Sequence, residues 1–184
     1  MLILIVGPSG AGKDTLLNAA REVLGGDARF RFVRRVITRV GDGGEEAHEG
    51  VTEEGFRVRE EAGDFALSWR AHGLRYGVPA DIALDLARGR VVVVNVSRAV
   101  VAEAAARFPV AVVEIMAPAG VLAERLAARG REDAEDVARR LSRAIEVPVA
   151  VVRHVVVNDG SVAEGAGRLV AAIREAEAPG SEKG

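Results

Sequence analysis

The stretch VGPSGAGKDTLL, residues 6–17, holds the residues whose types and spacing point most directly to chemistry. Gly7 and Gly12 lie five positions apart and precede Lys13, as in the phosphate-binding pattern G-x-x-x-x-G-K-[ST]. Glycines let successive backbone N–H groups turn toward an anion, and the lysine reaches the terminal phosphates. A plain strand-to-helix turn needs neither the second glycine nor the lysine. The pattern therefore predicts nucleoside triphosphate binding.

Asp14 departs from this pattern, because it stands where a magnesium-binding hydroxyl is expected, with Thr15 one residue later. The helix dipole alone favours an acidic residue in the first turn of a helix. A carboxylate beside bound phosphates is nevertheless repulsive unless a divalent cation lies between them. We therefore expect Asp14 to hold Mg²⁺, directly or through water.

The elements around this loop predict an α/β fold. Apolar runs at 1–6, 90–94, 111–115 and 154–157 read as buried strands. Helical spacing follows them at 14–24, 99–107, 119–129 and 162–175. Continuous apolar strands that alternate with helices predict a doubly wound parallel sheet, covered by helices on both faces.

Two segments interrupt the alternation within a single domain. Residues 35–81 are polar and rich in glycine, which favours a small insertion that folds over the core and could close on a substrate, and residues 125–143 form an arginine-dense helical stretch. The core is then 1–34, 82–124 and 144–176, and 177–184 is expected to be a disordered tail.

Composition narrows the class of protein. The chain has 184 residues, 49% of them hydrophobic, and a net charge of −2, so nothing favours nucleic acid or an anionic membrane as a partner. Cysteine is absent and His48, His72 and His154 are scattered, which excludes thiolate metal sites and argues against a zinc cluster. With no apolar run long enough to span a membrane, we expect a soluble cytoplasmic protein.

Motifs along nearly the whole chain carry a family resemblance. GPSGAGKD, ITR at 37–39, GDFALSW at 63–69, HGLRYGVP at 72–79, VVNVSRA at 93–99, RGRE at 129–132 and RRL at 139–141 resemble the guanylate-kinase fold of P-loop kinases. Within that fold, GKD, SW-x-AHGL-x-YG and N-x-SRA resemble ribose 1,5-bisphosphate phosphokinases. The resemblance implies ATP-dependent phosphorylation of the 1-phosphate of ribose 1,5-bisphosphate, which gives 5-phosphoribosyl 1-diphosphate in phosphonate catabolism.

The resemblance also implies roles for individual residues. It implies a single kinase domain in which 35–81 binds the substrate and 125–143 is a lid. The catalytic cations are expected to be Lys13, Arg39 and the lid arginines Arg129 and Arg140. The expected ATP contacts are Gly7, Pro8, Ser9, Gly10, Ala11, Gly12, Lys13, Asp14, Thr15, Arg125 and Asn158. The expected contacts to the sugar phosphate are Arg39, His48, Trp69, His72, Tyr76, Asn95, Ser97 and Arg98.

Simpler structural roles stay open for several of these residues. The lid arginines also fit a solvated helix face with acidic partners, and Asn158 fits an ordinary turn. His48 fits a surface position equally well. Packing explains Trp69 and His72 as readily as substrate contact does.

Three departures argue against guanine as the substrate. Asp42 replaces the second arginine of the guanylate-kinase pattern, Ser68 replaces the glutamate that reads the base, and Val78 replaces a serine or threonine. An apolar residue cannot hydrogen-bond a base, and a lost glutamate removes an acceptor. A guanylate kinase, and a non-catalytic guanylate-kinase-like interaction module, remain the alternatives, but such modules tend to lose the loop lysine that this chain keeps.

Asn95 is a fourth departure from the guanylate-kinase pattern, and we relate it to the unusual Asp14 of the glycine loop. Guanylate kinases end the central strand with an acidic residue near the metal, whereas this strand ends in neutral Asn95. We hypothesise that the two changes compensate, so that the carboxylate near Mg²⁺ comes from Asp14 on the helix instead of from the strand.

Overall fold

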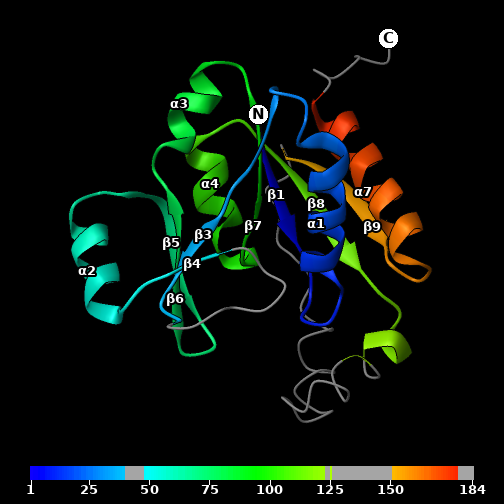
Figure 1. Cartoon of the computed structure of the whole chain (residues 1–184), viewed down its shortest axis with the longest axis horizontal. Coiled ribbons are helices and arrows are strands. Elements are labelled where there is room, and N and C mark those ends of the chain that lie inside the picture. Colours follow the sequence, from blue (N-terminus) through cyan, green and yellow to red (C-terminus); the bar gives the residue numbers. More distant parts are fainter. Residues whose placement is uncertain (40–47, 123–124, 126–150, 178–184) are drawn as a thin grey trace.

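A computed structural model describes residues 1–39, 48–122, 125 and 151–177 (Figure 1). Five parallel strands form the central sheet in the order β2-β7-β1-β8-β9. β1 lies in the middle of this sheet, and all five of its residues are apolar and buried. The strands are β1 (Leu2–Val6), β2 (Phe30–Phe32), β7 (Val91–Asn95), β8 (Val110–Met116) and β9 (Val152–Val157).

Helices cover both faces of this sheet, as predicted. Alternate residues of β1 belong to different apolar clusters: Ile3 and Ile5 pack with α1 and α7, whereas Leu2 and Leu4 pack with α3 and α4. The doubly wound α/β fold is therefore confirmed. The helices are α1 (Lys13–Leu24), α3 (Ile82–Ala87), the 3₁₀ turn η1 (Arg98–Val100), α4 (Val101–Arg107) and α7 (Val162–Glu177).

A second sheet of four strands lies within the segment predicted to be an insertion. Its order is β4-β3-β6-β5, and β5 and β6 form an antiparallel hairpin. His72 and Gly73 turn this hairpin with φ of +52° and +73°, as expected of a tight hairpin turn. The elements are β3 (Arg35–Ile37), β4 (His48–Gly50), α2 (Glu53–Glu61), β5 (Phe65–Ala71) and β6 (Leu74–Pro79).

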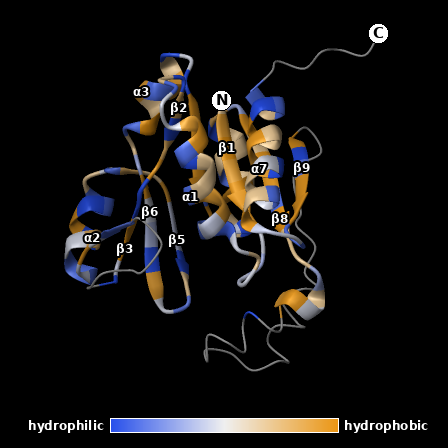
Figure 2. Ribbon diagram, turned by 45° about the vertical axis from the view of Figure 1, so that its right-hand side comes forward, coloured by the Kyte–Doolittle hydropathy of each residue, from blue (hydrophilic) through white to orange (hydrophobic). Residues whose placement is uncertain are grey.

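Shared apolar packing fixes the second sheet against the first. Ala66, Leu67 and Val78 belong to the same buried cluster as Leu2 and Leu4 of β1. Figure 2 shows the contrast between the hydrophobic strands of the central sheet and the hydrophilic helix α2 at the outer end of the second sheet. The hairpin β5–β6 is thus held beside the carboxyl end of β7, where it can contribute side chains to a site.

Some boundaries differ from those predicted. β9 begins two residues earlier, at Val152, and α7 continues to Glu177. The start of the disordered tail was predicted at residue 177, one residue too early: Glu177 is helical and accepts a 2.8 Å hydrogen bond from Arg29. Most of the predicted lid, 126–143, and residues 178–184 lie outside the described part of the chain. Among the described helices, none is long and apolar enough to cross a membrane.

Candidate active site

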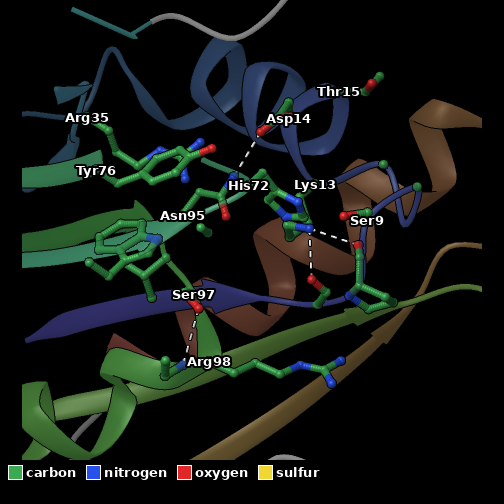
Figure 3. Close-up of a pocket in the computed structure, with 18 residues that line it drawn as sticks. Ser9, Lys13, Asp14, Thr15, Arg35, His72, Tyr76, Asn95, Ser97 and Arg98 are labelled. Carbon is green, nitrogen blue, oxygen red and sulfur yellow. Dashed lines mark hydrogen bonds between the residues drawn. The ribbon is translucent and has the colours of Figure 1, made fainter. Parts of the chain in front are cut away.

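A cavity of about 650 Å³ opens where the glycine loop, the end of β7 and the hairpin β5–β6 meet. Figure 3 shows its walls, with Lys13 and Asp14 facing the aromatic side chains of the second sheet. The residues that line it are Gly7, Pro8, Ser9, Gly10, Gly12, Lys13, Asp14, Thr15, Arg35, Trp69, Ala71, His72, Tyr76, Asn95, Val96, Ser97, Arg98 and Ala99. Most residues expected to bind ATP or the sugar phosphate therefore surround one space.

The glycine loop has a backbone that other residues cannot adopt without strain. Gly7 has φ of +147°, and a Cβ atom there would lie 2.1 Å from the carbonyl oxygen of Ile115. Gly12 has φ of +84° and begins α1 without a side-chain cap. The first N–H groups of a helix have no acceptor within the helix. At this helix they adjoin the cavity, so the loop is suited to an anion.

Lys13 supplies the cation of the loop. Its Nζ atom donates hydrogen bonds of 2.8 Å to the carbonyl oxygens of Gly7 and Pro8. These contacts fold the side chain back over the loop, at the wall of the cavity. The ammonium group is therefore positioned where the terminal phosphates of a nucleotide are expected.

Asn158 supports the loop from below rather than from within the cavity. Its side chain is 4% exposed, does not line the cavity, and donates a 2.8 Å hydrogen bond from Nδ2 to the carbonyl oxygen of Ala11. Ala11 is itself fully buried. Both residues were expected to contact ATP; the structure places them behind the loop, outside the lining of the cavity.

Asp14 and Asn95 come together at the wall of the cavity. Asn95 Nδ2 donates a 2.9 Å hydrogen bond to Asp14 Oδ1 (Figure 3). The carboxylate on α1 thus meets the end of β7, where guanylate kinases carry an acidic residue. Thr15 also lines the cavity, but its side chain leaves the helix in another direction (Figure 3).

Three side chains of the second sheet form a layered wall. The rings of Trp69 and Tyr76 stack nearly parallel, at 5° and 5.3 Å between centroids, because their backbones pair across the hairpin. The guanidinium carbon of Arg35 lies 5.4 Å from the centre of the Tyr76 ring. Arg35 was not among the predicted site residues. Arg35 and Arg39 lie four positions apart, so in an extended segment their side chains share one face. That spacing was the signal that could have found Arg35.

Two predicted phosphate contacts do not line this cavity. Arg39 lies beyond the end of β3, and its charge acts on Arg35. His48 is 9% exposed and lies in β4, so the surface position considered from the sequence is wrong. Burial, together with the charges of Arg39, Arg35 and Arg34, lowers the pKa of His48 below its ordinary value. The imidazole is therefore neutral near pH 7.

Arg98 lies on the opposite wall and is anchored to the sheet (Figure 3). Its Nη2 atom donates a 3.2 Å hydrogen bond to Glu114, which is 2% exposed and also pairs with Arg153. A buried carboxylate is costly unless it is paired and hydrogen-bonded. Glu114 therefore holds the guanidinium of Arg98 in place against the sheet.

The positions that read guanine in guanylate kinases face away from the cavity. Val78 is fully buried in the apolar cluster beneath the second sheet. Ser68 Oγ donates a 2.7 Å hydrogen bond to Glu60, which also accepts one from Arg75. Neither side chain lines the cavity, so neither is placed to recognise a base there.

Asp42, Arg129 and Arg140 lie outside the described residues. Arg125 lies within them, and its Nη1 atom donates a 3.4 Å hydrogen bond to the carbonyl oxygen of Gly10. No group of three or more acidic or histidine side chains that could hold a metal ion is found within the described ranges.

Curated relatives match most of the chain. A ribose 1,5-bisphosphate phosphokinase PhnN of Methylobacterium radiotolerans is 49% identical over 174 residues, which cover 94% of this chain and 97% of that protein. This chain belongs to the ribose 1,5-bisphosphate phosphokinase family. The family's protein from Acidiphilium cryptum is 55% identical over 143 residues, which are 78% of this chain and 76% of the relative.

Some of the similar proteins are longer and bifunctional. The bifunctional ribose 1,5-bisphosphokinase-thymidine phosphorylase of Cupriavidus necator is 50% identical over 172 residues, which are 92% of this chain but 28% of the relative. A similar protein of Azorhizobium caulinodans is 47% identical, with 25% of its length covered. The chain thus spans about a quarter of the length of these bifunctional proteins. No family model matches it.

Solved structures agree on the fold. A guanylate kinase from Anaplasma phagocytophilum superposes with a TM-score of 0.73 at 19% identity, over 97% of this chain and 86% of that one. A gluconokinase from Sinorhizobium meliloti superposes with a TM-score of 0.52 at 21% identity, over 95% and 93% of the two chains. This member of the phosphokinase family therefore has a guanylate-kinase-like fold.

Proposed function

We propose that the chain transfers the γ-phosphoryl group of ATP to the 1-phosphate of ribose 1,5-bisphosphate, giving 5-phosphoribosyl 1-diphosphate and ADP in phosphonate catabolism. The observation that carries this proposal is the match, over nearly the full length, to relatives named for that activity. The cavity supports it, because an anion-binding loop faces basic and aromatic side chains. Ser68 and Val78, the base-reading positions, are turned away.

The chain's own residues would act through positioning and charge. Phosphoryl transfer spreads negative charge over the oxygens of the moving group, and fixed cations stabilise it. Lys13 and the amides of the glycine loop would hold the donor phosphates, and Arg39 would hold the acceptor. The acceptor is itself a phosphate and already anionic near neutral pH, so the reaction needs no general base. Arg129 and Arg140 are the proposed lid cations.

Mg²⁺ is the proposed cofactor, and oxygen atoms at the cavity fit it. Asp14 offers a carboxylate beside the loop, and the side chain of Asn95, which carries an amide oxygen, is hydrogen-bonded to it. When bound, the ion would neutralise charge on the donor phosphates. Asp14 would orient the ion, and the hydrogen bond from Asn95 holds the carboxylate of Asp14 in a defined direction.

Two rival functions give different results in one assay. We expect ADP release, followed with a coupled assay, to be fast with ribose 1,5-bisphosphate and at background with GMP and AMP. Turnover with GMP alone would identify a nucleotide kinase. No turnover with any acceptor would favour a non-catalytic interaction module.

The Lys13→Met variant serves as the control for that assay. Removing one charged donor from the transferring phosphates is expected to lower kcat by at least about 100-fold. The melting temperature should change little, since Lys13 lies at the cavity wall and not in an apolar cluster. Activity that survives in Lys13→Met would indicate a contaminating kinase.

A further inference from the structure

Arg35 is a buried arginine at the wall of the cavity. It begins β3, is 8% exposed and lines the same space as Lys13 and Asp14. A guanidinium keeps its charge near neutral pH even in such surroundings. The planar fork of a guanidinium matches the oxygen atoms of a phosphate. An arginine at the wall of this cavity is therefore suited to an anionic ligand.

The surroundings of Arg35 hold its guanidinium in a defined place. Tyr76 supports one side of it at 5.4 Å, and Tyr76 is itself stacked on Trp69. Cations are attracted to aromatic faces at such distances. Burial lowers the pKa of Arg35, and the nearby charge of Asp14 opposes that shift. The guanidinium is therefore preorganised between the aromatic wall and the glycine loop.

Arg35 is a second arginine close to Arg39, and the guanylate-kinase pattern leads one to expect two. The second arginine of that pattern is Asp42 in this chain. Arg35 lies four positions before Arg39 and close enough for the two charges to act on one another. An anion close to both arginines would reduce the repulsion between their charges. A phosphate group would provide that anion.

We propose that Arg35 binds the phosphate of the acceptor sugar that receives the phosphoryl group. This inference rests on the proposed function. The charge of Asp14 acts on Arg35, and both line the same cavity as Lys13, so Arg35 borders the space where transfer would occur. Arg98 stands on the other wall with Glu114 and is better placed for a different part of the sugar phosphate (Figure 3).

Arg35→Gln and Arg35→Lys test the proposal in steady-state kinetics. A charge-assisted hydrogen bond to phosphate makes a contribution that corresponds to about ten- to a hundredfold in affinity. We expect Arg35→Gln to raise the KM for ribose 1,5-bisphosphate by that factor and the KM for ATP by less than about twofold. Arg35→Lys should recover part of the loss, because it keeps the charge without the planar fork.

Arg34→Gln is the matched control. Arg34 precedes Arg35, is exposed, and donates from Nη2 to the carbonyl oxygen of His48 without lining the cavity. The Arg34→Gln variant should keep the wild-type KM values for ATP and for ribose 1,5-bisphosphate. An equal rise in the KM for ATP and for the sugar in Arg35→Gln, with a lower melting temperature, would reduce Arg35 to a structural link and overturn the proposal.

Binding without turnover separates the two phosphates of the acceptor. Trp69 is the sole tryptophan and lines the cavity, so its fluorescence can report ligand binding. We expect Arg35→Gln to weaken ribose 1-phosphate about tenfold or more and to leave ribose 5-phosphate unchanged. The opposite order would overturn the assignment of the phosphate. A wild-type chain that binds ribose 1-phosphate through Arg35 but does not turn over would contradict the proposed function alone.

Discussion

At the scale of single residues, Asp14 and Asn95 carry the clearest departure from guanylate kinases. The strand end has lost a carboxylate and the helix has gained one, and the 2.9 Å hydrogen bond places both side chains at the same point. A unit charge about 4 Å away is worth roughly 4 kcal/mol at an effective dielectric near 20. The position of the carboxylate therefore matters for any cation bound beside the loop.

Asp14→Ser should raise the Mg²⁺ concentration needed for half-maximal rate by about tenfold or more, because the remaining hydroxyl carries no charge. Adding Asn95→Asp to this variant returns a carboxylate to the strand and should restore most of the response. Rates measured across a Mg²⁺ titration at saturating ATP would test both. If Asp14→Ser leaves the titration unchanged and the double variant restores nothing, the two departures do not compensate.

At the scale of elements, the end of β9 supports the glycine loop. Asn158 donates to the carbonyl oxygen of Ala11, and its own backbone N–H donates to Met116 at the end of β8. A Cβ atom on Gly12 would lie 2.5 Å from Asn158 Nδ2, so loop and side chain are in close contact. The sequence offered only an Asn-Asp-Gly turn here, because the contact joins residues 147 positions apart.

Asn158→Ala should destabilise the fold and weaken ATP binding together. It leaves the carbonyl oxygen of buried Ala11 without this donor, which costs about 1–3 kcal/mol. In a chain of this length, that loss corresponds to a melting temperature lower by about 2–12 °C. Thermal denaturation and the KM for ATP would measure both effects.

Asp159→Ala is the control for that experiment. Asp159 is the next residue, is exposed and pairs with Arg168, and exposed ion pairs contribute little to stability. We expect its melting temperature and its KM for ATP to stay close to those of the wild type. Equal losses in the two variants would mean that the turn as a whole, and not the Ala11 contact, supports the loop.

At the scale of the whole molecule, the sequence predicted those features that depend on residues close together along the chain. Apolar runs and helical spacing predicted the central sheet and its helices, and the glycine spacing predicted the loop, because each signal lies within a few residues. The burial of Arg35 and His48 follows from the second sheet. Its strand β3 pairs with Tyr76, 39 positions from Ile37. No periodicity in a three-residue strand specifies such a partner.

A charged cluster at the far edge of the central sheet ties distant segments together and should be sensitive to acid. Asp85 in α3 is 5% exposed and accepts hydrogen bonds from Arg31 of β2 and from Arg90 before β7. The hydrogen bond from Arg31 is the main cause that lowers the pKa of Asp85 below its ordinary 3.8. The folded state therefore binds this proton less readily than the unfolded chain.

The sign of the pH dependence follows from that lowered pKa. The stabilisation by Asp85 is complete above the unfolded value near 3.8 and is lost as the pH falls through the lower folded value. Asp85→Asn should thus melt several degrees below the wild type at pH 7, and the gap should narrow from pH 4 downward. Asp81→Asn, which removes the exposed partner of Arg31, should melt close to the wild type at every pH. A gap for Asp85→Asn that stays constant between pH 7 and pH 3 would mean that its ionisation does not stabilise this edge of the sheet.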